Sequence, residues 1–223
     1  MILSTEQNTI NQMRLRCLLG WLSLLLPWIQ VILLHYFPGS ISITYFSYAF
    51  APFMIILGAS AILLICYKGY DIVDDIINTA AGIFGLLICM FPCNPQYDCL
   101  CVIGPFQIDP VVSNIIHCIS AGIFFALLSF NSLFSFTKSS GEVTPNKTKR
   151  NIIYRVCGIG MLLSFTLFFV PDFSSKIWLI ETIALFFFGI SFLTKADRYW
   201  WLFADVPSDL SVKLIQRIRS KKS

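Results

Sequence analysis

Residues 17–37 read CLLGWLSLLLPWIQVILLHYF, an apolar run with no Asp, Glu, Lys or Arg. A hydrocarbon layer about 30 Å thick is crossed by roughly 20 helical residues, so this run has the length of a membrane span. Five further apolar runs follow along the chain, at 45–67, 76–92, 111–136, 152–170 and 177–194. The sequence therefore predicts an all-α, polytopic transmembrane helix bundle of about six spans.

The overall composition agrees with lipid as the surrounding solvent. Of the 223 residues, 57% are hydrophobic and 13% are charged, and the mean hydropathy is +0.75. A water-soluble domain carries roughly 25% charged residues, so half of the charge needed for a soluble surface is missing. The net charge of +4 comes from basic residues beside apolar runs, which argues against nucleic acid as a partner.

The basic residues also predict the orientation. They gather before the first run and after the second, fourth and sixth, whereas 38–44 and 93–110 have none and 171–176 has only Lys176. Because Lys and Arg near span ends stay on the cytoplasmic side, we expect both termini in the cytoplasm of a bacterial-type inner membrane. We divide the chain into a membrane domain, 1–198, and a basic tail, 199–223, which either lies on anionic lipid or is solvated.

Eight cysteines fall into two groups. Cys93, Cys99 and Cys101 lie in or beside the predicted outer connection, where an oxidising compartment permits a disulfide between Cys93 and either of the others. Free thiols are the main alternative, and metal binding is disfavoured because no histidine is close in sequence. The other five cysteines lie in or at the ends of spans, as packing residues do.

Two ionisable residues inside the predicted spans are the first candidates for function. His117 and Glu181 enter from the outer face at similar depth, and such groups are costly in lipid. Helical spacing puts Ser120 on the His117 face, and Tyr48 lies near enough along the second span to join a ligand-binding site. A pocket in which His117 pairs with Glu181 is one interpretation. Interhelical hydrogen bonds with no chemistry are the other, and the one we favour.

Small residues and acids predict helix contacts rather than chemistry. Asn78, Gly82, Gly85 and Cys89 form a stripe that allows close approach of a neighbouring helix. Before this stripe, the acids at 71, 74 and 75 are placed to cap a helix N-terminus, which explains them without a cation site.

Five segments carry a family resemblance: LGWLS (19–23), YKGYD (67–71), NTAAGIFG (78–85), HCISAGIFF (117–125) and RNIIYRVCG (150–158). They resemble a group of bacterial multi-pass inner-membrane proteins, and this resemblance implies the bundle but no activity. A more distant similarity is to the membrane hydrolases that include alkaline ceramidases and adiponectin-type receptors, which place Ser, His and Asp around a metal. This chain has two histidines where that pattern needs three, so we expect neither a metal nor another cofactor.

The functional expectation is accordingly modest. We expect a non-enzymatic membrane protein that binds a lipid or small molecule or serves as an accessory subunit, with membrane lipids as partners and oligomers formed through the small-residue faces. The alternative is a lipid hydrolase, metal-assisted or acid/base, with His117 as base or ligand and Glu181 as its partner. The sequence contains no phosphate-binding glycine loop, His-Glu-x-x-His motif or Gly-x-Ser-x-Gly turn.

Overall fold

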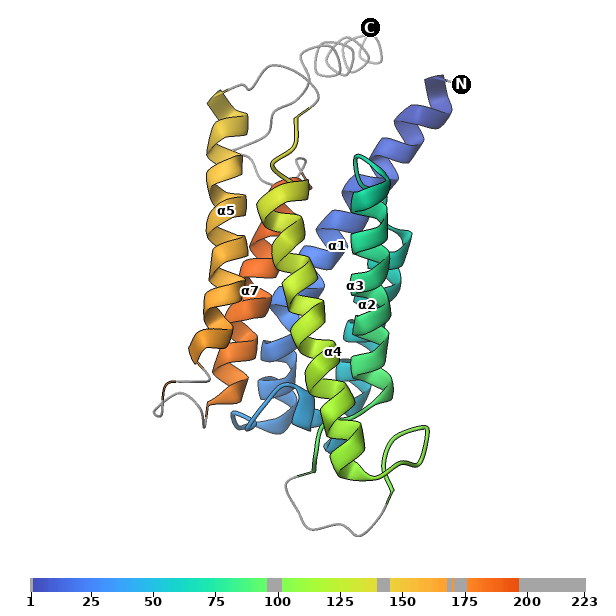
Figure 1. Cartoon of the computed structure of the whole chain (residues 1–223), viewed down its shortest axis with the longest axis vertical. Helices are drawn as coiled ribbons and strands as arrows, with labels where there is room; N and C mark the ends of the chain where they lie inside the picture. The colour runs from blue at the N-terminus through green and yellow to red at the C-terminus, as the bar shows by residue number, and fades with distance from the viewer. Residues whose placement is uncertain (1, 96–101, 140–144, 168–169, 171–175, 197–223) are drawn as a thin grey trace, which may run out of the picture.

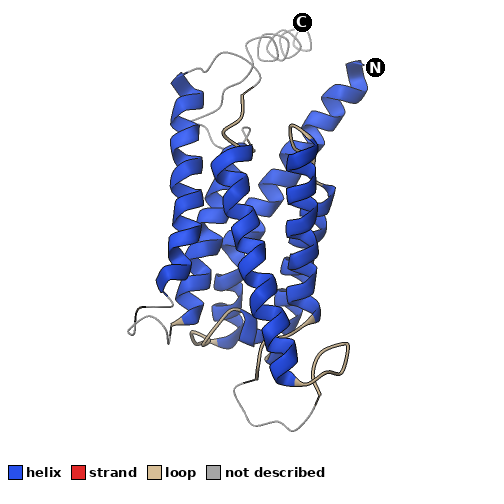
Figure 2. Cartoon of the chain, viewed as in Figure 1, coloured by secondary structure: helices blue, strands red, loops and turns tan. Residues whose placement is uncertain are grey.

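The computed structural model describes residues 2–95, 102–139, 145–167, 170 and 176–196. Within them the chain is all-α, as predicted: the only β-type pairing is an isolated bridge between Ile103 and Ile108 (Figure 2). The helices are α1 (Ile2–Leu34), η1 (Ser42–Phe46), α2 (Phe50–Cys66), α3 (Ile72–Met90), α4 (Pro110–Phe130), η2 (Asn131–Ser135), α5 (Pro145–Thr166) and α7 (Ile177–Lys195). η1 is a 3₁₀-helix, and η2 is a π-helix that continues α4.

Four segments are long and apolar enough to cross a membrane, as in a helical membrane protein: Asn11–Leu34, Ile72–Met90, Pro110–Ser135 and Ile177–Lys195. The other two predicted spans correspond to helices that differ from the expectation. α2 is apolar but has 17 residues, and α5 has 22 residues with a polar, basic first half.

The long helices run up and down, and each packs against its neighbours in the chain, with α7 closing the ring against α1 (Figure 1). The N-terminus, the 67–71 turn and the ends of η2 and α7 share one end of the bundle, which we call the basic end. The described basic residues that gather there are Arg14, Arg16, Lys68, Lys138, Lys147, Lys149, Arg150 and Lys195. At the other end, the outer end, lie the described connecting residues 35–49, 91–95 and 102–109 and residue Lys176.

The predicted small-residue stripe on α3 is confirmed as a helix contact. Asn78, Gly82, Gly85 and Cys89 are all buried. A Cβ on Gly82 would lie 2.5 Å from the Ala61 carbonyl oxygen of α2, so these two backbones touch. Small residues at such crossings allow close packing in membranes, where no hydrophobic effect drives helices together.

The second predicted span begins five residues too early. Residues 42–46 form η1 and the chain turns at 47–49, so α2 starts at Phe50. The Ser47 hydroxyl accepts from the Ala49 N–H, as it does in turns that open a helix. Pro52 lies in the first turn of α2, where its missing N–H is not needed.

Candidate functional site

The connection between α1 and α2 covers the outer end of the bundle. His35 takes a left-handed conformation (φ 59°) directly after α1 and turns the chain. Buried Gln30 of α1 then donates to the Thr44 hydroxyl at 2.7 Å, and the Trp178 N–H of α7 donates to the Gly39 carbonyl at 2.9 Å. Side chain and backbone of two helices therefore fix this connection over the bundle.

Glu181 of α7 binds the same connection from the side that faces the bundle. Its carboxylate accepts hydrogen bonds from the Ile41 backbone N–H and, at 3.1 Å, from the Ser42 hydroxyl. The carboxylate lies one turn into α7, and both of its donors come from the start of η1. Hydrogen bonds to a carboxylate are stronger than those between neutral groups, so Glu181 fastens η1 to α7.

Below this contact, Glu181 lines a cavity of about 40 Å³ inside the ring of helices. The other lining residues are Leu26, Ile41, Ser42, Phe53, Leu57, Ile88, Ala121, Phe124, Phe125 and Leu185. They come from η1, from Ile41 directly before it and from every long helix except α5. The cavity lies between α4 and α7, which make few contacts with each other. It combines apolar walls with one carboxylate.

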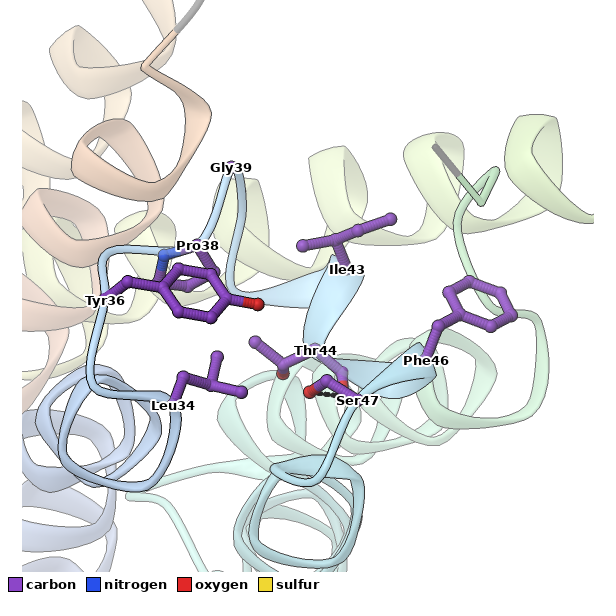
Figure 3. A pocket seen from close by; sticks show the side chains of 8 residues that line it. All are labelled: Leu34, Tyr36, Pro38, Gly39, Ile43, Thr44, Phe46 and Ser47. Carbon is purple, nitrogen blue, oxygen red and sulfur yellow. Dashed lines mark hydrogen bonds between the residues drawn. The ribbon is translucent and has the colours of Figure 1, made fainter. Parts of the chain in front are cut away.

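A second hollow, of about 180 Å³, lies on the other side of η1. Figure 3 shows the Tyr36 ring across it, with the hydroxyl directed toward Ile43 and Thr44. Thr44 and Ser47 add polar groups, and Leu34 and Phe46 add apolar ones. An apolar cavity of about 150 Å³ accepts benzene, so this hollow has room for a group of that size. We call the two hollows, η1 and Glu181 together the outer-end site.

His117 contacts a different connection at the outer end, the one that follows α3. Its ring is buried, and Nδ1 lies 2.8 Å from the Phe91 carbonyl oxygen, an atom that only accepts. One turn earlier, the Ser113 hydroxyl donates to the Pro92 carbonyl at 2.7 Å. These two side chains of α4 satisfy the backbone that leaves α3, where the helical hydrogen bonds have ended.

The structure does not pair His117 with Glu181. Each of them bonds backbone of a different connection, and His117 is not among the residues that line either hollow. Ser120 is buried on the same α4 face without lining them, and Tyr48 is 93% exposed beside the outer-end site. Of the four predicted ligand-binding residues, Glu181 is therefore the one that lines either of these two hollows.

The predicted disulfide falls partly outside the described residues. Cys99 and Cys101 lie there, so a bond to either stays a prediction. Cys93 has no disulfide partner among the described residues, and burial raises the pKa of its thiol to about 12. At neutral pH this thiol is protonated and a poor nucleophile, since the thiolate is the reactive form.

Sequence reasoning missed a polar network at the basic end. Asp71 caps α3 as expected, its side chain accepting from the Asp74 N–H at 3.0 Å. Asp74, however, turns inward with 1% of its side chain exposed and binds the Lys138 ammonium at 2.6 Å and the Ser135 hydroxyl at 2.7 Å. The recurrence of Ser and Asn at 129–135, at the end of an apolar span, was the available signal.

This network continues toward the middle of the bundle. Asn78 donates to the Asp74 carbonyl, Asn131 donates to the Asn78 side chain at 2.8 Å, and Ser132 bonds Ser191 of α7 at 2.6 Å. η2 supplies three of the inward-facing groups, and π-helical turns of this kind are frequent at functional sites.

Within the described ranges, no group of three or more His, Cys, Asp or Glu residues is placed to hold a metal ion. No protein-family model matches the chain, and no curated protein or solved structure is significantly similar to it. The class that the fold defines is therefore that of an all-α protein with helices able to cross a membrane.

Proposed function

We propose that this protein is a non-enzymatic, six-span protein of a bacterial-type cytoplasmic membrane that binds a lipid or other small amphiphile at the outer-end site. Both termini lie in the cytoplasm. The observation that carries the proposal is the Glu181 carboxylate, which faces an apolar cavity between α4 and α7. A charged group inside a membrane bundle is costly and is retained where it binds something.

The chemistry of the site indicates the kind of ligand. Glu181 accepts hydrogen bonds, and its present donors, Ile41 and Ser42, belong to η1. A ligand with an ammonium or another donor at its head can replace these donors, while its chain enters the apolar space that Phe124, Phe125 and Leu185 line. The cavity is small, so binding requires η1 to move outward.

The hydrolase alternative finds less support. An acid/base pair needs two groups within hydrogen-bonding reach of each other or of one reacting atom. His117 bonds the Phe91 carbonyl, whereas Glu181 bonds η1.

The charge distribution and the helix lengths together support the proposal of six spans. α2, with 17 residues, extends about 26 Å, which spans a locally thinned bilayer. α5, with 22 residues, extends about 33 Å, and the buried positions of Lys147 and Arg150 keep these two basic side chains out of the lipid. With all six helices crossing, the basic end faces the cytoplasm.

This topology predicts an alternating pattern of reporter activity. Alkaline phosphatase, which is active only outside the cytoplasm, should be active when fused after Pro38, Pro95 or Lys176. Green fluorescent protein, which folds in the cytoplasm, should fluoresce after Lys68, Ser139 or the C-terminus. Loss of the alternation across α2 or α5 would remove that helix from the spans and refute the six-span arrangement.

Ligand binding predicts a dependence on the Glu181 charge. An alkylamine with a photoactivatable diazirine in its chain should label peptides of η1 or α7 in the purified protein. Glu181→Gln should weaken this labelling about tenfold, because a hydrogen bond to a charged group contributes about 1.5–3 kcal/mol. Thr182→Ala, which removes a hydroxyl bonded only to the Trp178 carbonyl, is the matched control and should label normally. Equal labelling of Glu181→Gln, or equal labelling by the same chain with a carboxylate head, would contradict the proposal.

A further inference from the structure

Gln30 is a buried polar residue of α1 that the proposed function does not yet use. Its side chain is fully buried, with 0% of the residue exposed. Leu26, four residues earlier, lines the Glu181 cavity, and Leu34, four residues later, lines the second hollow (Figure 3). Residues spaced by four share one face of a helix. Gln30 therefore lies on the α1 face that joins the two hollows of the outer-end site.

The Gln30 carboxamide and the Glu181 carboxylate bind the same residue of the connection. Gln30 Nε2 donates to the Ile41 carbonyl at 3.3 Å, and the Glu181 carboxylate accepts from the Ile41 N–H. The Ser42 hydroxyl also donates to Glu181, at 3.1 Å. The Thr44 hydroxyl accepts from Gln30 Nε2 at 2.7 Å. The two side chains therefore form one polar site at the start of η1.

Among the described residues, one hydrogen-bonding atom of this site has no partner. It is Gln30 Oε1, which is buried. The neighbouring Thr44 hydroxyl does not supply a donor, because its hydrogen goes to the Ile41 carbonyl at 2.6 Å. A buried acceptor without a donor is costly, above all in a membrane bundle, where the surrounding hydrocarbon offers none. The unpartnered oxygen indicates a ligand that brings a hydrogen-bond donor.

We infer that the ligand of the outer-end site has a vicinal amino alcohol as its head, with an ammonium for Glu181 and a hydroxyl on the neighbouring carbon for Gln30. This inference rests on the proposed function, in which an ammonium replaces the η1 donors of Glu181 and η1 moves outward. The same movement takes the Ile41 carbonyl and the Thr44 hydroxyl away from Gln30. The ligand must therefore provide a partner for the amide as well.

A hydroxyl suits the amide in both chemistry and position. It donates to Oε1 or accepts from Nε2, so it pairs with Gln30 in either orientation of the amide. Gln30 already binds a hydroxyl, that of Thr44. The nitrogen and the carbonyl oxygen of Ile41, which Glu181 and Gln30 bind, are attached to adjacent carbons, Cα and C. A vicinal amino alcohol has the same arrangement of nitrogen and oxygen, whereas a simple amine leaves Gln30 without a partner.

The test measures how well unlabelled compounds displace the photoactivatable alkylamine from the purified full chain. The first competitor is a straight-chain amine with its amino group on the second carbon. The second is the same amine with a hydroxyl on the first carbon, and the third is that alcohol without the amino group. We expect the amino alcohol to displace the label at about tenfold lower concentration than the amine, and the alcohol not to displace it.

Two variants assign this preference to Gln30. Gln30→Met replaces the amide with an apolar chain of similar length and should bind the amine and the amino alcohol equally. Thr44→Val breaks the same contact with η1 but keeps the amide, so it should retain the tenfold preference. Because the two competitors are compared within each variant, a general change in the position of η1 affects both equally.

Equal displacement by the amine and the amino alcohol in the wild-type protein would overturn the inference and leave the Glu181 site in place, whether or not a variant folds. A preference that persists in Gln30→Met, or that is also lost in Thr44→Val, would show that the amide does not select the hydroxyl. If the alkylamine does not label the wild-type protein at all, the proposed function fails and the inference fails with it.

Discussion

Replacing Lys138 with methionine should destabilise the bundle by about 3 kcal/mol. Removing one partner of a fully buried ion pair costs about 3–5 kcal/mol, and here only the Asp74 partner is buried, so we expect the lower end of this range. The Asp74 side chain is 1% exposed, whereas that of Lys138 is 36% exposed. Without the ammonium at 2.6 Å, the Asp74 carboxylate keeps only the Ser135 hydroxyl and the Tyr70 N–H. Reversible unfolding in mixed detergent micelles measures the loss.

A double variant isolates the electrostatic origin of this effect. Asp74→Asn combined with Lys138→Met should recover at least half of the lost stability, because a neutral amide needs no cation nearby. Lys68→Met breaks the exposed pair with Asp75 and should cost less than about 1 kcal/mol. If the double variant were no more stable than Lys138→Met alone, packing of the lysine stem would explain the loss and the ion pair would not.

The Asp71–Lys138 contact should be insensitive to pH over a wide range. Hydrogen bonding to Lys138 lowers the pKa of Asp71, and hydrogen bonding to Asp71 and then to Asp74 raises the pKa of Lys138. A lowered acid pKa gives stability that is present above the unfolded value of about 3.9 and is lost on acidification. A raised lysine pKa gives stability that is present below about 10.4 and is lost in base. The measured difference between wild type and Lys138→Met should therefore be flat between these limits.

The helical bundle could be predicted because hydrophobic length is read directly from the sequence. The run 177–194 differs from α7 (Ile177–Lys195) by one residue, and 111–136 closely matches α4 with η2. The run 45–67 failed at its start, since Tyr45 and Phe46 of η1 are aromatic and join the apolar sequence of the helix that follows. Hydropathy cannot distinguish a 3₁₀ turn bonded to Gln30 and Glu181 from the first turn of a span.

The polar residues of the site were found by type, but their partners were not. Because ionisable groups are costly in lipid, the sequence singled out Glu181 and His117. In the structure His117 is buried and Glu181 is half-buried. Their partners belong to the 35–49 and 91–95 connections, and no periodicity within a helix predicts where a connection folds back. The contact of Lys195 with the Phe136 carbonyl was not predicted for the same reason. In the sequence, a basic residue after a span indicates topology whether its side chain points to water or into the bundle.

Gly82→Ala should destabilise the bundle by forcing α2 and α3 apart. The added Cβ would lie 2.5 Å from the Ala61 carbonyl oxygen and 2.5 Å from Ile65 Cγ1. A side chain can rotate away, but the Ala61 oxygen belongs to the backbone of α2, so α2 and α3 must separate. Overpacking of this kind costs about 1–3 kcal/mol, and in a membrane the lost contact is itself the source of helix association.

Gly122→Ala provides the matched control on α4, since nothing lies within 4 Å of its added Cβ. There the gain in helix propensity, about 1 kcal/mol, acts alone, so this variant should unfold at the same or a higher detergent fraction than wild type. The two alanines therefore shift stability in opposite directions although the chemical change is identical. If Gly82→Ala also left the unfolding midpoint unchanged or raised it, the close α2–α3 crossing would be absent in the membrane, and with it the ring of helices that encloses the Glu181 cavity.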